Sequence, residues 1–180
     1  QGADVATPVS MTTPDPVALH ATLADMNAAG IAYLAMEASS HGLDQHRLDG
    51  VKITAAGFTN LTRDHLDYHQ TMDKYRDSKM RLFRDVLRDN GTAVVNADIP
   101  EGEMIKNICA QRNLRCWTYG YHGNDFKILS RTPRADGQAV RLNILGQEIE
   151  FILPLVGEFQ LMNVLCAAGL VLARREKCLQ

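Results

Sequence analysis

Short apolar runs alternate along this chain with segments of helical periodicity, and this alternation constrains the fold more than any other feature. Residues 31–36 and 53–59 are almost entirely apolar, which is typical of strands buried on both faces of a parallel sheet. Helical periodicity precedes the first run at residues 15–29 and follows the second at residues 73–88. The pattern predicts an α/β fold, with a mostly parallel sheet flanked by helices and right-handed crossovers.

The second half of the chain continues this alternation and then changes it. An Asn-Gly turn at residues 90–91 is expected to lead into a strand at residues 92–96, followed by a helix at about residues 101–112. Alternating segments separated by glycine-containing turns then predict a small antiparallel meander near residues 124–154. The remaining expected elements are strands at residues 115–119, 126–130, 139–144 and 148–153 and a helix at residues 159–174.

Composition indicates one soluble domain. A length of 180 residues with 46% hydrophobic content suffices for a single core, and no apolar run reaches the roughly 20 residues of a spanning helix. Lys and Arg total 19 against 21 for Asp and Glu, which argues against a nucleic-acid partner. The cysteines form no CxxC pair and follow no secretory leader, so we expect a reduced, cytoplasmic, monomeric protein. They are Cys109, Cys116, Cys166 and Cys178.

Polar side chains follow both of the first two predicted strands. Glu37, Ser39 and His41 come directly after the run at residues 31–36, and residues 60–69 follow the second run. In open parallel sheets ligands bind beyond the carboxyl ends of the strands. The two clusters are therefore expected to share one crevice.

The densest polar cluster is Asp64, His65, Asp67 and His69. Imidazole and carboxylate together suit a divalent cation, so the cluster is a candidate metal site and the basis for a metallohydrolase alternative. A polar loop that caps the following helix explains the same residues equally well.

Other candidate residues also have ordinary explanations. The segment TTPDP at residues 12–16 is a good helix start, Lys79 lies on the polar side of a helix, and Arg47 could form a surface ion pair. Glu37 comes directly after a predicted strand and close to Ser39. This position favours a functional role for the carboxylate over a solvated strand end. No GxxxxGK[ST] loop is present, so part of any ATP site would lie elsewhere.

Several motifs together, in order and spacing, resemble the central domain of the Mur ligases, and within that family the MurE type. The motifs are TTPDP at residues 12–16, MEASSHGL at 36–43, QHR at 45–47, FTNLTRDHLDYH at 58–69, YRDSK at 75–79 and GEFQLMN at 157–163. The resemblance spans nearly the whole chain and implies a P-loop-NTPase-like fold. It also implies a fragment, because the P-loop, the amino-terminal uridine-binding domain and the carboxyl-terminal domain are missing.

The resemblance implies an ATP- and Mg²⁺-dependent ligase of peptidoglycan synthesis. Such an enzyme adds an amino acid, meso-diaminopimelate or lysine, to UDP-MurNAc-L-Ala-D-Glu through an acyl phosphate. By position, Glu37 and His65 resemble magnesium ligands, and Lys79 resembles the family's carbamylated lysine, with Lys79 and His65 in the catalytic centre. The resemblance assigns Thr12, Thr13, Ser39, Gln45 and Arg47 to the muramoyl-dipeptide and Asn60, Gln160 and Asn163 to the nucleotide.

Gln160 departs from the family pattern, because many relatives have Asn there. A non-catalytic binding module that kept the fold is a second alternative, and a P-loop upstream in the full-length gene would distinguish the two.

Overall fold

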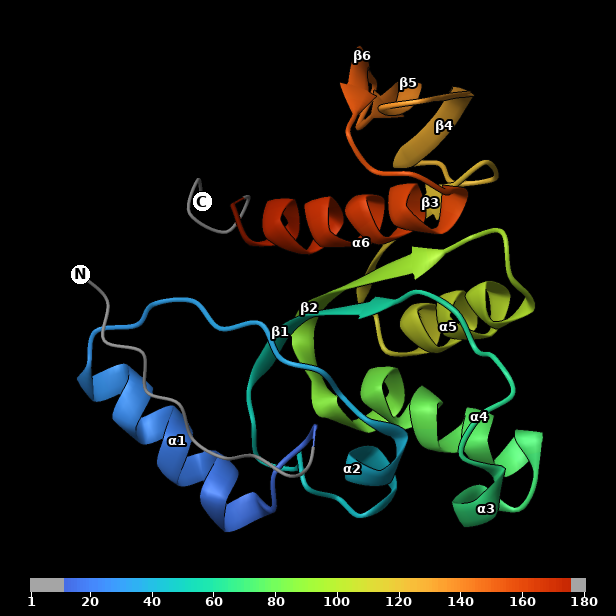
Figure 1. The fold of residues 1–180 in the computed structure, drawn as a ribbon. Helices are drawn as coiled ribbons and strands as arrows, with labels where there is room; N and C mark the ends of the chain where they lie inside the picture. Colours follow the sequence, from blue (N-terminus) through green and yellow to red (C-terminus); the bar gives the residue numbers. More distant parts are fainter. Residues whose placement is uncertain (1–11, 176–180) are drawn as a thin grey trace. The chain divides into compact units, whose positions relative to one another are not determined.

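A computed structural model describes residues 12–175, which divide into two compact units. The first unit comprises the chain up to Val51 together with His65–Leu82, and the second comprises Lys52–Asp64 and the chain from Phe83 onward. Figure 1 shows the helices and strands of both. Cys178 lies outside the described residues.

The second unit is built on a six-stranded sheet in sequential order. The first four strands are parallel to one another, and the fourth, fifth and sixth pair antiparallel. The expected α/β sheet and its antiparallel meander are therefore confirmed. The strands are β1 (Ile53–Phe58), β2 (Leu87–Asn96), β3 (Arg115–Gly120), β4 (Phe126–Arg134), β5 (Gly137–Ile144) and β6 (Gln147–Leu153).

Two helices cover the parallel strands, α6 (Glu158–Arg175) on one face and α5 (Pro100–Gln111) on the other (Figure 1). The α6 face holds the main core, in which Tyr119 and Phe126 are fully buried together with Leu161. Gly57 allows the close approach of this helix, because a Cβ there would lie 2.6 Å from the sulfur of Cys166. Both helices were expected within one residue of these ends.

The helix expected at residues 73–88 is shorter than predicted. Helix α4 (Met72–Arg81) passes into the π-helix η1 (Leu82–Val86), and β2 begins at once with Leu87. The register then jumps from Ile53 opposite Leu87 to Ala55 opposite Thr92, with Asn90 left-handed at φ 60°. The predicted turn at residues 90–91 thus takes the form of a bulge inside β2. Apolar spacing alone did not distinguish helix from strand at residues 87–88, where β2 begins.

The first unit contains helices and loops. Its helices are α1 (Pro16–Ala28), α2 (Ser40–Asp44), α3 (Leu66–His69) and α4. Side chains of Asp15, Ser39 and Thr71 cap α1, α2 and α4 by accepting hydrogen bonds from backbone N–H groups of the first turn. The short helices α2 and α3 lack the length that would make their periodicity visible in the sequence.

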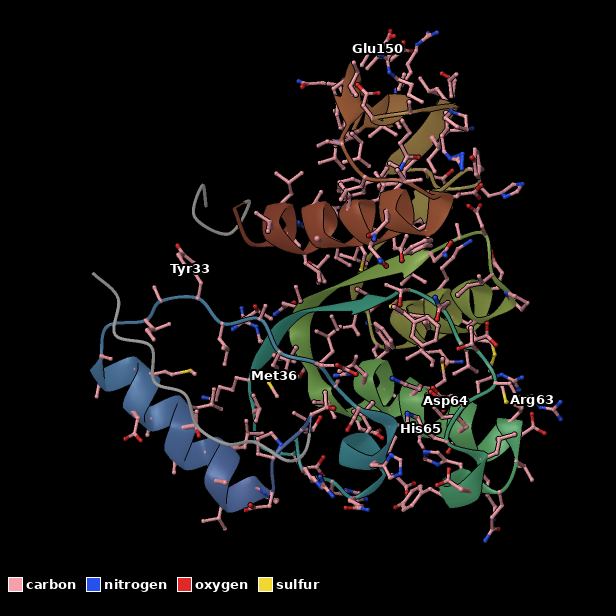
Figure 2. All side chains as sticks on the ribbon, in the orientation of Figure 1. Tyr33, Met36, Arg63, Asp64, His65 and Glu150 are labelled. Carbon is pink, nitrogen blue, oxygen red and sulfur yellow. The ribbon has the colours of Figure 1, made fainter. Side chains whose placement is uncertain are left out.

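The prediction of a strand at residues 31–36 is wrong. The segment has no regular secondary structure, and Ile31, Tyr33 and Leu34 are 49%, 66% and 49% exposed. Figure 2 shows the side chain of Tyr33 pointing away from the ribbon. A strand requires a neighbour that satisfies its backbone N–H and C=O groups, and no described strand pairs with this segment. Apolar composition alone could not supply that partner.

Across residues 12–175, no helix combines the length and the apolar character that crossing a membrane requires.

Candidate functional site

A cavity of about 260 Å³ in the first unit collects most of the residues that the sequence indicated. Its walls come from the chain before α1, the loop before α2, the start of α3 and the face of α4. The lining residues are Thr12, Thr13, Glu37, Ser39, Ser40, His41, Arg47, His65 and Lys79. Gln45 is absent from this set.

Thr13 fastens one wall of this cavity. Its hydroxyl donates to the carbonyl oxygen of Glu37 and accepts from the N–H of Ser39, both at 3.0 Å. Thr13 is 1% exposed, and a Cβ at Gly42 would lie 2.6 Å from its methyl group. Because the hydroxyl donates one hydrogen bond to the backbone and accepts another from it, Thr13 holds the loop that carries Glu37 and Ser39 in place.

Arg47 and Gln45 support the same wall. The Arg47 guanidinium donates to the carbonyl oxygen of Thr13 at 2.7 Å and to the amide oxygen of Gln45 at 3.0 Å. The Gln45 amide nitrogen in turn donates to the Tyr68 hydroxyl at 3.0 Å. Arg47 therefore lines the cavity in a fixed orientation. Gln45 does not line the cavity but contacts Arg47 and Tyr68.

The two serines of this loop differ in what their hydroxyls contact. Ser39 Oγ accepts from the N–H of Gly42 at 3.0 Å and caps α2. Ser40 Oγ is buried and has no hydrogen-bond partner among the described residues. The sequence indicated the whole Ser-Ser-His run beside Glu37, but only Ser39 was assigned to the substrate.

Lys79 projects from α4 into the cavity. Its ammonium donates to the carbonyl oxygen of Ala38 at 3.4 Å. Burial lowers the pKa of Lys79, and the nearby Glu37 carboxylate partly offsets that shift. Most helical lysines are solvated, so a desolvated lysine facing a carboxylate across a small cavity is a candidate reactive group.

His65 enters the site from the first residue before α3. Its backbone is left-handed, at φ 54°, which is uncommon for a non-glycine residue. Its ring packs edge-on against His41 at 5.1 Å between centroids and against Tyr75 at 6.0 Å. This aromatic contact fixes the ring beside the cavity wall.

His69, four residues further on, has a different environment. It is 3% exposed, its ring stacks on Tyr75 at 5.2 Å, and Nε2 has no hydrogen-bond partner in the described part of the chain. Burial lowers the pKa of His69, with the nearby charge of Asp44 acting in the opposite direction. His69 lines a separate, more open cavity of about 560 Å³ with Asp44 and Ser78.

The metallohydrolase alternative gains no support from this arrangement. Within residues 12–175, no group of three or more His, Cys, Asp or Glu side chains could hold a metal ion. Asp67 and His69 do not line the cavity that contains His65. The four residues from Asp64 to His69 are close in sequence, but they form no such group among the described residues.

The residues assigned to the nucleotide lie in the second unit. Asn60 follows β1 and is exposed, Gln160 is half-buried in the first turn of α6, and Asn163 is exposed one turn later. The structure thus places Asn60 in the loop after β1 and both Gln160 and Asn163 on α6, and neither of the two cavities described above contains any of them.

The second unit is an α/β sheet domain, and the first unit holds a lysine, a carboxylate and a histidine around one polar cavity. The family model for the Mur ligase middle domain matches residues 1–171. The chain belongs to the Mur ligase family.

Individual relatives agree with this placement. The chain is 47% identical over 165 residues to the UDP-N-acetylmuramoyl-L-alanyl-D-glutamate–2,6-diaminopimelate ligase of Mesorhizobium japonicum, covering 91% of this chain and 34% of the relative. A solved structure of a ligase with the same name superposes with a TM-score of 0.80 at 31% identity, over 92% of this chain and 34% of the other. The chain therefore spans about a third of the length of these relatives.

A more distant likeness extends to the fold alone. The crystal structure of MurF ligase from Thermotoga maritima in complex with ADP superposes with a TM-score of 0.56 at 18% identity. It covers 68% of this chain and 28% of that one.

Proposed function

We propose that this chain is the ATP- and substrate-binding middle part of a ligase that joins 2,6-diaminopimelate to UDP-MurNAc-L-Ala-D-Glu in peptidoglycan synthesis. The relatives at 42% to 47% identity carry the name of that activity. ATP use is supported by the ADP complex of the MurF ligase that shares the fold. The whole enzyme would work as a monomer in the cytoplasm.

The observation that carries the proposal is the position of Lys79 opposite Glu37 in the cavity that His65 also lines. Burial favours the neutral amine, which is the form that reacts with CO₂. Addition of CO₂ forms a nitrogen–carbon bond, releases one proton and leaves a carbamate with a carboxylate-like end. Lys79 would thereby change from a cation into an anionic oxygen ligand.

The residues present fit a magnesium site only with that change. Glu37 and His65 supply one oxygen and one nitrogen ligand, and the Lys79 carbamate would supply further oxygens. Unmodified, the described residues form no group of three suitable side chains. Magnesium, when bound, neutralises phosphate oxygens and so favours attack on the phosphorus.

The cavity wall opposite α4 offers the groups that would hold the muramoyl-dipeptide. Thr12 and Arg47 line the cavity, and Arg47 is already oriented by Thr13 and Gln45. A guanidinium suits the anionic groups of that substrate. Ser40 also lines the cavity, and its buried hydroxyl has no hydrogen-bond partner among the described residues. Thr13 and Gln45 would contribute by positioning these side chains.

The proposed reaction has two displacements. The D-glutamyl carboxylate attacks the γ-phosphorus of ATP and releases ADP, which gives an acyl phosphate. The amino group of diaminopimelate then attacks the acyl carbon, loses a proton and displaces phosphate. The task of the protein is alignment and charge neutralisation, and Asn60, Gln160 and Asn163 would contact the nucleotide.

The direct test measures phosphate release by the full-length protein with ATP, Mg²⁺ and UDP-MurNAc-L-Ala-D-Glu. Diaminopimelate, L-lysine or no amino acid is added in parallel reactions. We expect release that requires both the nucleotide sugar and diaminopimelate. Release with lysine instead would correct the amino acid, and no release under any condition would leave the non-catalytic binding module as the better explanation.

A further inference from the structure

Two cysteines of the second unit lie against each other at the junction of α5 and β3. Cys109 is in the last turn of α5 and is 1% exposed, whereas Cys116 is the second residue of β3 and is half-buried. Their thiols lie close enough for each to shift the pKa of the other. Both are free thiols.

The backbone explains why the two side chains face each other. Trp117 and Tyr119 belong to the core on the α6 face of the sheet, so the alternation of a strand directs Cys116 to the α5 face. On α5, Ile105 and Cys109 are one helical turn apart and both buried, so they share the face that packs on the sheet.

The connection between the helix and the strand is short and hydrogen-bonded. The N–H of Leu114 donates to the carbonyl oxygen of Cys109 at 2.8 Å, and Asn113 takes the left-handed conformation that ends the helix, at φ 53°. The first residues of β3 therefore lie directly below the last turn of α5. The two thiols are close together because this turn is tight and because β3 is held in the sheet by its pairing with β2.

The surroundings favour a reactive thiolate at one member of the pair. The Cys116 thiol lowers the pKa of Cys109, burial opposes this, and the Arg112 guanidinium lowers the pKa further. Arg112 is held in place by donating to the carbonyl oxygens of Phe83 and Leu87, each at 2.8 Å. Cys116 keeps its proton, because the neighbouring Cys109 and the burial of Cys116 raise its pKa. The thiolate is the form that attacks peroxides.

We propose that Cys109 and Cys116 are a redox modification site that forms a reversible disulfide with hydrogen peroxide as oxidant. Cys109 sulfur attacks one peroxide oxygen, the O–O bond breaks, and a sulfenic acid and one water result. Cys116 sulfur then attacks the Cys109 sulfur and displaces its hydroxyl group as a second water. Two electrons pass from the two thiols to the peroxide, and reduction by a dithiol restores the pair.

Tryptic peptide mapping of the full-length protein tests this site directly. Cleavage at Lys106, Arg112 and Arg115 places Cys109 in the peptide of residues 107–112 and Cys116 in that of residues 116–127. After peroxide treatment of the native protein and alkylation of the remaining thiols, we expect these two peptides linked, with the loss of two hydrogen atoms. Dithiothreitol should return both in alkylated form.

Three variants complete the experiment. Cys109→Ser and Cys116→Ser should each abolish the linked pair, whereas Cys166→Ser, at a buried thiol on α6, should leave its yield unchanged. If both cysteines stay fully alkylatable in the treated wild type, or carry only separate oxygen adducts, the proposal is wrong. Linked peptides that arise only between protein molecules, seen as a dimer on a non-reducing gel, would overturn it as well.

Discussion

Different interactions stand out within each of the two units of this chain. The second unit buries a continuous apolar core between its sheet and α6, with Tyr119, Phe126 and Leu161 fully inaccessible. The first unit also buries apolar side chains, among them Leu43, Leu48 and Met80. Its polar side chains add directional bonds between segments, as when Arg81 donates to the carbonyl oxygen of Leu43 and pairs with Asp49 at 3.3 Å. The cavity with the candidate catalytic groups lies in this first unit.

The stability of the fold and the positioning of single side chains therefore depend on different interactions. Apolar burial is non-directional and scales with area, so it stabilises a fold without specifying the orientation of a single side chain. Hydrogen bonds to fixed carbonyl oxygens orient side chains, although each contributes little net free energy. The substitutions below should therefore reduce stability most in the second unit and activity most in the first.

The largest effect on stability is expected from Phe126→Ala. Phe126 is fully buried and packs edge-on against Trp117 at 5.6 Å between ring centroids, so truncation leaves a cavity and should cost about 3–5 kcal/mol. Chemical denaturation followed by Trp117 fluorescence measures this loss. Leu129→Ala, on the same strand but 38% exposed, should cost far less. Equal losses for the two variants would contradict a core on this face.

Lys79→Ala should affect activity more than stability. Loss of a group that places charge at the reacting phosphate should lower ligation by the full-length enzyme by roughly 10²-fold or more, while removal of a desolvated amine leaves the midpoint of unfolding nearly unchanged. Steady-state phosphate release measures the former. Acetate should partly rescue Lys79→Ala, because it can replace the carbamate oxygens.

The matched control is Lys74→Ala, on the same helix, where the exposed ammonium donates to Gln70 at 2.8 Å. It should keep nearly full activity. Full activity in Lys79→Ala would remove Lys79 from the mechanism, and loss of activity in both variants would indicate a general effect of α4.

Thr13→Val is expected to combine a moderate loss of stability with a loss of activity. The variant keeps the volume beside Gly42 but leaves the N–H of Ser39 without its acceptor, at a cost of about 1–3 kcal/mol. Thermal unfolding and the KM for the nucleotide sugar report the two effects. Thr13→Ser retains the hydroxyl and should lie closer to wild type, and Thr12→Ala should raise KM without changing stability. A Thr13→Val protein as stable and active as wild type would argue against Thr13 as a positioning residue.

The smallest expected effect is a dependence of stability on pH through Asp44. Burial acts to raise its pKa, but hydrogen bonds from Tyr68 and Ser78, with the charges of His69 and Arg81, bring it below the ordinary value of 3.8. A lowered folded-state pKa means that the contribution to stability is complete above pH 3.8 and is lost as the pH falls through the folded value. Asp44→Asn should therefore flatten the acid side of a plot of Tm against pH. An unchanged acid slope would show that these bonds do not favour the charged carboxylate.

The sequence by itself determined the α/β class, the meander, the helices α1, α5 and α6, and the family, because these follow from local periodicity, turn residues and motif spacing. Glu37, His65 and Lys79 were also identified from sequence, although their roles depended on resemblance.

Only the tertiary structure decided the rest. The apolar run at residues 31–36 is no strand, because pairing requires a neighbour that composition cannot specify. The hydroxyl of Thr13 bonds to backbone groups, Ser40 Oγ has no hydrogen-bond partner within residues 12–175, and Cys109 contacts Cys116. Each of these outcomes depends on where a second segment of the chain passes. Local sequence describes what a residue can bond, and the packing of distant segments determines which bond it makes.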